Sequence, residues 1–70
     1  MNLHFSIEYH TEWGQHVAVE ITATRNQGSK VNHLFLLETS DGYHWAADIS
    51  LPEKDVQTFR YNYIICAGEQ

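Results

Sequence analysis

The chain alternates apolar and polar residues over most of its length, and this two-residue period restricts its fold more than any other feature. In residues 2–9, Leu3, Phe5 and Ile7 share one parity, and polar residues separate them. Successive side chains of a β-strand point to opposite faces, so this pattern predicts a strand with one buried face. The pattern predicts five strands, over residues 2–9, 15–22, 31–38, 43–51 and 58–65.

Turn residues separate the predicted strands. Gly14 indicates a turn after Trp13, and we expect the first two strands to form a hairpin or to lie near each other. Asp41-Gly42 favours a tight hairpin turn, and Pro52 ends the fourth strand. Residues 23–30 read as a loop, and residues 67–70 read as a frayed end or a cut.

These elements predict an all-β fold. No segment keeps a helical period of 3.6 residues, so we predict no helix. Five strands with short turns favour an antiparallel β-sandwich or open barrel, and so few strands leave exposed sheet edges. The third strand is unusual because Leu34, Phe35, Leu36 and Leu37 are apolar on both faces. It requires either burial on both sides or a partner.

Length and charge restrict the class of protein. Seventy residues make one small domain, and the single Cys66 excludes an internal disulfide. A formal charge of −5 with only four Lys and Arg residues argues against binding to nucleic acid or anionic membranes. No apolar run is long enough to span a membrane, and the first residues lack the basic-then-apolar pattern of a signal peptide, so we expect neither a transmembrane helix nor a signal peptide. We therefore expect a cytoplasmic protein.

Two tryptophans are the candidate binding residues. Trp13 falls on a loop tip, where it either packs against the domain or offers a flat ring to a sugar. Trp45 has the parity of Ile49 and Leu51, so a core position is the stronger alternative to a sugar platform. Polar side chains that could bind sugar hydroxyls are Glu12, Gln15, Asn62 and His10.

Metal binding and catalysis find little support in the sequence. The five histidines show no recognised ligand spacing with a cysteine or carboxylate, so we expect no metal and no cofactor. Cys66 has no base placed near it by the sequence, and nothing sets Glu12 and Glu53 at the spacing of a glycosidase pair. We expect no enzymatic activity in this chain.

The order of several motifs resembles the starch-binding domain family, carbohydrate-binding module family twenty. The matching segments cover most of residues 3–65 and read Phe-Ser-Ile-Glu-Tyr at 5–9, Thr-Glu-Trp-Gly-Gln at 11–15, Val-Ala-Val at 17–19, Trp-Ala-Ala-Asp-Ile-Ser-Leu-Pro at 45–52 and Phe-Arg-Tyr-Asn-Tyr at 59–63. The resemblance implies an immunoglobulin-like antiparallel β-sandwich, here short, with about five strands. It is strongest to the module at the N-terminus of 4-alpha-glucanotransferases of the amylomaltase or disproportionating-enzyme type.

The resemblance also implies a function and a site. Residues 1–70 would be one non-catalytic module, an N-terminal fragment that holds starch, glycogen or maltooligosaccharides near a downstream catalytic domain. Its glucan site would use Trp13 and Trp45, with Tyr43 or Phe35 as a third aromatic residue. The family's second site is not expected, because residues 23–30 hold no Trp and Asn62 replaces its Lys. The alternative is a structural or oligomerisation module of the same fold, with a homodimer through exposed strand edges.

Overall fold

The computed structural model describes residues 2–67, which form five strands and no helix. The strands are β1 (Asn2–Glu8), β2 (Gln15–Arg25), β3 (Lys30–Leu36), β4 (His44–Ser50) and β5 (Val56–Ala67). The all-β prediction is confirmed, and each predicted strand corresponds to an observed one. No helix within this range could cross a membrane. The reading of residues 67–70 as an end without regular structure is wrong for Ala67, which closes β5. Residues 68–70 lie outside the described residues.

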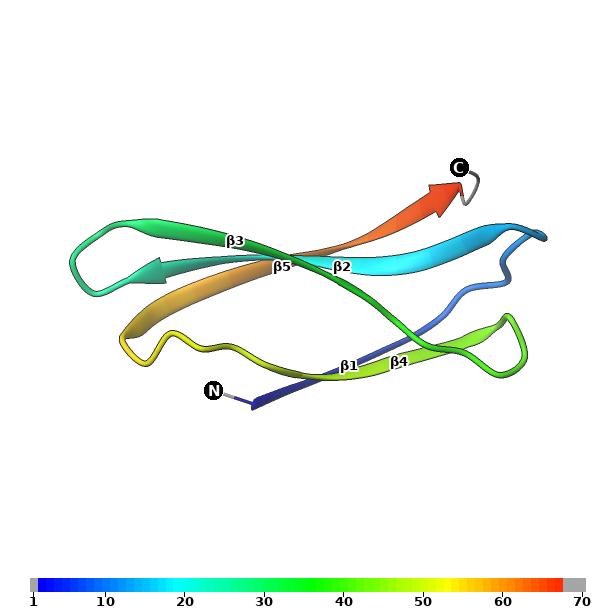
Figure 1. Cartoon of the computed structure of the whole chain (residues 1–70), viewed down its shortest axis with the longest axis horizontal. Helices are drawn as coiled ribbons and strands as arrows, with labels where there is room; N and C mark the ends of the chain where they lie inside the picture. The colour runs from blue at the N-terminus through cyan, green and yellow to red at the C-terminus, as the bar shows by residue number, and fades with distance from the viewer. Residues whose placement is uncertain (1, 68–70) are drawn as a thin grey trace.

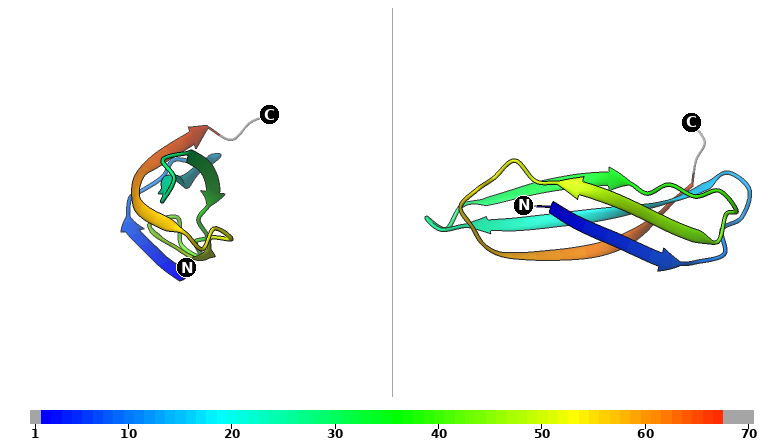
Figure 2. Two further views of the ribbon diagram at one scale, coloured as in Figure 1. Left: turned by 90° about the vertical axis from the view of Figure 1, so that its left-hand side faces the viewer. Right: turned by 90° about the horizontal axis from the view of Figure 1, so that it is seen from below.

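The strands form two antiparallel sheets that face each other as two layers. β1 pairs with β4, and β2 lies between β3 and β5 (Figure 1). Seen from below, β1 and β4 lie side by side in front of the three-stranded layer (Figure 2). The molecule is elongated, with extents of 42 × 22 × 15 Å.

The core fills the space between the layers. The central strand β2 contributes Val17, Val19 and Ile21, which are fully buried because β2 has a neighbour on each side and a sheet beneath it. The other members of the buried cluster come from the two-stranded sheet and its flanks: Phe5, Leu37, Trp45, Ile49 and Leu51. The inward parity read from the sequence is thus the parity of the core for β1, β2 and β4.

The first two strands do not form a hairpin, one of the two arrangements expected, and they lie in different sheets. β1 pairs only with β4 among the described strands, from Asn2 opposite Ser50 to Glu8 opposite His44. Loop residues 9–14 then carry the chain into the other layer. Alternation specifies which face of a strand is buried but not which strand lies beside it, so two strands of opposite layers resemble a hairpin in sequence.

The chain changes layers again after β3. The Leu37 amide donates to the Val17 carbonyl of the three-stranded sheet, at 2.9 Å. The next residue, Glu38, exchanges two backbone hydrogen bonds with Ala46 of β4, at 2.9 and 3.0 Å. Figure 1 shows this descent of the chain from β3 towards the turn before β4. The predicted turn at Gly42 is confirmed, with a φ of 75°, but it joins strands of different sheets.

The predicted loop over residues 23–30 is shorter than expected. β2 continues to Arg25, and β3 already begins at Lys30. The extension is held by Arg25, whose Nε donates to the Asp55 carboxylate at 3.0 Å. The intervening turn has a Gly28 φ of 98°.

The apolar run of β3 is covered on one face only. Leu37 is buried and Phe35 packs against the core, whereas Leu34 and Leu36 are 60% and 65% exposed. No strand of the described chain covers their face. Burial on both sides, the first of the two alternatives, is therefore wrong within residues 2–67, and the second, a partner, stays a prediction.

Candidate functional site

One end of the molecule is built from the loop after β1 and the turn before β4. The Tyr9 amide donates to the Tyr43 carbonyl at 2.9 Å, which extends the β1–β4 ladder beyond its last strand residues. The Gly42 carbonyl accepts from both the amide and the hydroxyl of Thr11, at 3.0 and 2.8 Å. These bonds hold the two segments against each other.

Trp13 projects from the tip of this loop. The Gln15 amide donates to the Glu12 carbonyl at 3.0 Å, and the Glu12 amide donates to Gln15 Oε1 at 2.7 Å. Gly14 closes the turn with a φ of 89°, a conformation that residues with a Cβ rarely adopt. The Trp13 side chain is fully exposed. The loop therefore presents the indole to solvent and does not pack it against the domain.

Trp45 has the opposite environment. It is only 4% exposed and belongs to the core cluster. Its Nε1 donates to the Tyr9 carbonyl at 3.2 Å, which gives the buried indole N–H a partner. This corrects the expectation of an exposed second indole, because the parity that Trp45 shares with Ile49 and Leu51 directs it inward.

A groove of about 960 Å³ runs between the loop and the turn. It brings together four of the predicted site residues, since Trp13, Glu12 and Gln15 line it and the buried Trp45 contributes to its lining. Tyr43 is not part of this lining among the described residues; its hydroxyl donates to Glu8 instead, at 3.3 Å. The other proposed hydroxyl-binding residues, His10 and Asn62, also lie outside the groove.

The second wall of the groove consists of residues that the sequence indicated only as a turn. Thr39, Ser40, Asp41 and Gly42 line it, together with Leu37 and Glu38. The Thr-Ser-Asp-Gly run directly before the Trp45 strand is the signal that could have identified them. These residues place hydroxyl and carboxylate oxygens opposite the loop that carries Trp13.

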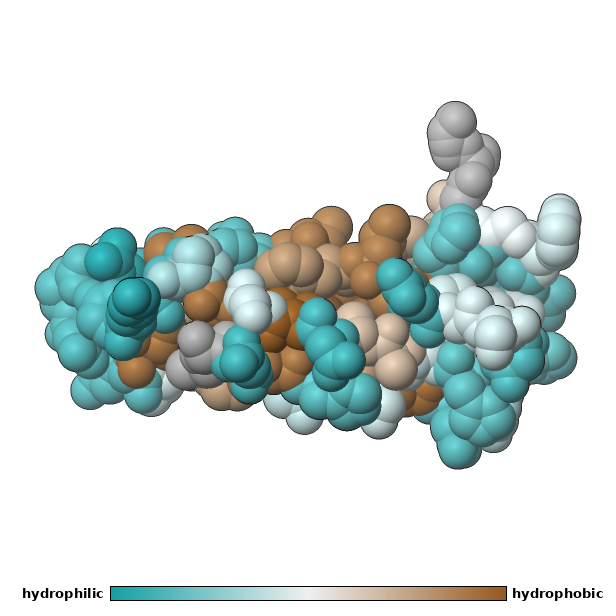
Figure 3. Space-filling view, turned by 60° about the horizontal axis from the view of Figure 1, so that its bottom comes forward, coloured by the Kyte–Doolittle hydropathy of each residue, from teal (hydrophilic) through white to brown (hydrophobic). Residues whose placement is uncertain are grey.

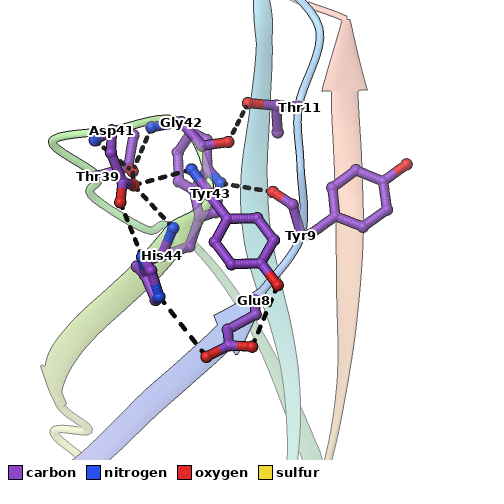
Figure 4. A network of polar contacts seen from close by, with 9 residues as sticks. Glu8, Tyr9, Thr11, Thr39, Asp41, Gly42, Tyr43 and His44 are labelled. Carbon is purple, nitrogen blue, oxygen red and sulfur yellow. Dashed lines mark hydrogen bonds and ion pairs between the residues drawn. The ribbon is translucent and has the colours of Figure 1, made fainter.

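Asp41 organises the turn (Figure 4). Its Oδ1 accepts hydrogen bonds from the amides of Tyr43 and His44, each at 2.9 Å, and from the Thr39 hydroxyl at 3.2 Å. The Gly42 amide donates to Thr39 Oγ1 at 2.9 Å. The backbone N–H of His44, then its ring and the N–H of Tyr43, hold the pKa of Asp41 well below its usual range.

His44 lies between two carboxylates. Its Nδ1 is 2.7 Å from Asp41 Oδ2, and its Nε2 is 3.6 Å from Glu8 Oε2 (Figure 4). The hydrogen bond with Asp41, followed by the charges of Asp41 and Glu8, raises the pKa of His44 above its ordinary value of 6.5. Through these contacts the His44 ring joins the end of β1 to the turn before β4.

The groove favours ligands without negative charge. Its lining includes the carboxylates of Glu12, Glu38 and Asp41 and no Lys or Arg from the described residues. A phosphate or sulfate group would find no cation among them, whereas a neutral polyol would find many hydrogen-bond partners. Residues 2–67 also hold no group of three or more His, Cys, Asp or Glu side chains that could bind a metal.

Comparison with known proteins adds no family assignment. The chain matches no protein-family model, and neither a curated protein nor a solved structure is significantly similar to it.

Proposed function

We propose that this chain is a non-catalytic carbohydrate-binding module of the immunoglobulin-like, starch-binding type, which binds α-1,4-glucan through Trp13 and the adjoining groove. The observation that carries the proposal is the position of Trp13, whose indole is fully exposed beside a groove lined with polar side chains. A glucose ring has a flat C–H face that can stack on an indole and a rim of hydroxyls that can bond to the groove. The parent protein would be a 4-alpha-glucanotransferase with a catalytic domain downstream.

A single stacking ring gives weak binding. Burial of roughly 100 Å² of apolar surface at about 25 cal/mol/Å² contributes only ~2.5 kcal/mol before the costs of association. Hydrogen bonds between sugar hydroxyls and the side chains of Glu12, Gln15 and Asp41, with the two carboxylates as acceptors, would add to this in a site that stays wet. We therefore expect dissociation constants near or above about 1 mM for a short oligosaccharide.

Weak binding fits a module that acts beside an enzyme. A tethered module raises the local concentration of a polymeric substrate even when its own affinity is low. Starch and glycogen present many equivalent chains, so repeated weak contacts retain the enzyme on its substrate. The module needs no catalytic group for this role.

The test is a titration of the 70-residue chain with maltoheptaose, followed by amide chemical shifts. We expect shifts to move in residues 11–16 and 39–42, and to move less with cellohexaose, a β-1,4-linked control of similar size. Trp13→Ala should abolish the response, and Trp13→Phe should weaken it, because phenylalanine offers a smaller ring. Binding that survives in Trp13→Ala, or amides that do not respond to a large excess of maltoheptaose, would refute the proposal.

A structural module without sugar binding is the second candidate. The burial of Trp45 supports it, because the site has one exposed indole where the resemblance implied two. The exposed apolar side chains of β3 support it as well. Under this alternative, maltoheptaose leaves the amide spectrum unchanged although the protein is folded.

A further inference from the structure

A second groove, of about 710 Å³, lies between β3 and β4. Its apolar lining comes from both strands: Phe35, Leu36, Ala47 and Ile49. The two strands belong to different sheets, and the chain crosses between them where Glu38 bonds to Ala46. The groove therefore lies beside this crossing, where the two layers diverge. Apolar residues are exposed along the middle of the molecule, between hydrophilic ends (Figure 3).

The edge of β3 beside this groove has no strand partner. Within residues 2–67, β3 pairs only with β2. The Leu37 amide donates to the Val17 carbonyl of β2, and residues of an antiparallel strand alternate in the side to which they bond. Leu34 and Leu36 therefore direct their amides and carbonyls away from β2. Their side chains are also exposed, so this edge offers both backbone hydrogen bonds and apolar contacts.

The other outer strand of the same sheet, β5, differs in two ways. Its side towards β1 is filled, because the Phe5 ring packs against Tyr61 at a centroid distance of 5.1 Å and the Tyr63 hydroxyl donates to a β1 carbonyl. β5 also carries Arg60 within the strand, whereas the one Lys of β3, Lys30, lies at the end remote from the groove. A groove and a free edge therefore coincide at β3.

Charge indicates which partner the groove would accept. Its lining includes the carboxylates of Glu38 and Asp48 and no Lys or Arg from the described residues. Glu38 forms no ion pair within residues 2–67, and Asp48 contacts only the exposed His4, at 2.6 Å. His44, which also lines the groove, is held between two other carboxylates. The chain carries a net charge of −5, so a second copy would be repelled and a basic partner attracted.

We propose that the free edge of β3 binds an extended segment of a basic partner protein, which adds to the sheet as an antiparallel strand. All ladders among the described strands are antiparallel, and backbone hydrogen bonds to a free edge supply affinity in complexes of this kind. Every second side chain of the added strand enters the groove over Phe35 and Ile49, where an aliphatic residue fits.

The alternate side chains of the added strand lie beside Leu34 and Leu36. The aliphatic stems of Lys or Arg can cover these leucines, while the charged ends extend towards the carboxylates of the groove. The preferred segment therefore alternates aliphatic and basic residues. This proposal is independent of sugar binding, and its test contains no sugar.

The test is a titration of the 70-residue chain with a blocked peptide of alternating lysine and valine, long enough to lie beside residues 32–36. We expect the amide chemical shifts of Leu34 and Leu36 to move, and a peptide of alternating glutamate and valine to move neither. The lysines share the face of these leucines, so their backbone N–H groups are the ones that donate to β3. Methylation of the lysine backbone nitrogens should therefore abolish binding, and methylation of the valine nitrogens should retain it.

Variants of the chain locate the site. Leu34 and Asn62 both lie opposite Glu20, on the two outer strands that flank β2. Leu34→Lys should weaken binding at least about tenfold, because its charge repels the lysines of the peptide. Asn62→Lys introduces the same charge on β5 and should bind as the wild type does. Glu38→Gln should weaken binding about two- to fivefold, the effect of one exposed ion pair. Circular dichroism spectra and melting temperatures check that the variants fold.

Several outcomes would overturn the proposal. One is the absence of any shift with a large excess of the lysine–valine peptide. Others are binding that survives methylation of the lysine nitrogens, or shifts in residues 59–65 or 11–16 in place of β3. An unmodified chain that sediments as a dimer, and that Leu34→Lys converts to a monomer, would show that a second copy occupies the edge.

Discussion

Truncation of Trp45 should destabilise the protein severely, whereas the same truncation at Trp13 should have almost no effect. Trp45 is 4% exposed and packs among the core side chains between the two sheets. Replacing a buried tryptophan with alanine costs about 3–5 kcal/mol, through lost burial and the cavity that remains. The Tyr9 carbonyl also loses the hydrogen bond that it accepts from the indole at 3.2 Å.

This cost is large for a chain of 70 residues. At roughly 0.05–0.15 kcal/mol per residue, the free energy of unfolding is about 4–10 kcal/mol. We therefore expect Trp45→Ala to lower the melting temperature by at least about 12 °C, or to unfold the chain at room temperature. Trp13 is fully exposed, so Trp13→Ala should change the free energy of unfolding by less than about 0.5 kcal/mol.

Urea denaturation followed by far-ultraviolet circular dichroism measures both variants without relying on tryptophan fluorescence. Trp45→Phe serves as an intermediate, since it keeps an aromatic ring in the core and loses the hydrogen bond to Tyr9. We expect the order of stability to be wild type and Trp13→Ala, then Trp45→Phe, then Trp45→Ala. Equal losses of stability in the two alanine variants would show that the assignment of one indole to the core and one to solvent is wrong.

Three further predictions concern the turn before β4. The pKa of His44 should be above 6.5 in a nuclear magnetic resonance titration, and Asp41→Ala should lower it, since the hydrogen bond with Asp41 is the main cause of the shift; an unchanged value in the variant would contradict this. A raised pKa means that the folded chain holds the proton more tightly than the unfolded chain. The resulting contribution of His44 to the free energy of unfolding is therefore complete below pH 6.5, and it is lost as the pH rises through the pKa of His44 in the folded chain. Melting temperatures measured across this range should fall with rising pH in the wild type, and the part due to His44 should vanish in His44→Gln. Gly42→Ala should lower the free energy of unfolding by about 1–2 kcal/mol, because the φ of 75° is strained for alanine. The methyl group itself has room, since its nearest neighbour, Thr11 Oγ1, is 3.5 Å away. An unchanged urea midpoint would refute this prediction.

The sequence predicted the strands and their buried faces but not their partners. A period of two residues records which side of a strand is apolar, so the inward positions of β1, β2 and β4 could be read directly. Pairing depends on how the layers stack, and β1 and β2 carry the same pattern although they lie in different sheets. The length of β2 was underestimated because Arg25 is a polar residue whose place in the strand depends on the distant Asp55.

The candidate site could be predicted in part. The loop position of Trp13 beside Gly14 follows from local sequence, as do the positions of Glu12 and Gln15 in the same loop, whereas the sequence left open whether Trp13 is packed or exposed. Trp45 shows the limit of the resemblance, because parity placed it in the core and the family motif placed it in the site. The Thr-Ser-Asp-Gly turn could be read from the sequence, but its place opposite Trp13 could not, since it approaches Trp13 only through the pairing of β1 with β4.

The passage of the chain from β3 to β4 has a consequence for how the protein unfolds. Leu37 and Glu38 are neighbours in the chain, yet the amide of each donates to a different layer. Neither layer can separate from the other without breaking a hydrogen bond at this point, and the buried side chain of Leu37 lies within the same junction. Loss of structure in either sheet is thereby transmitted to its counterpart, so that a chain with so small an interior melts as one cooperative unit.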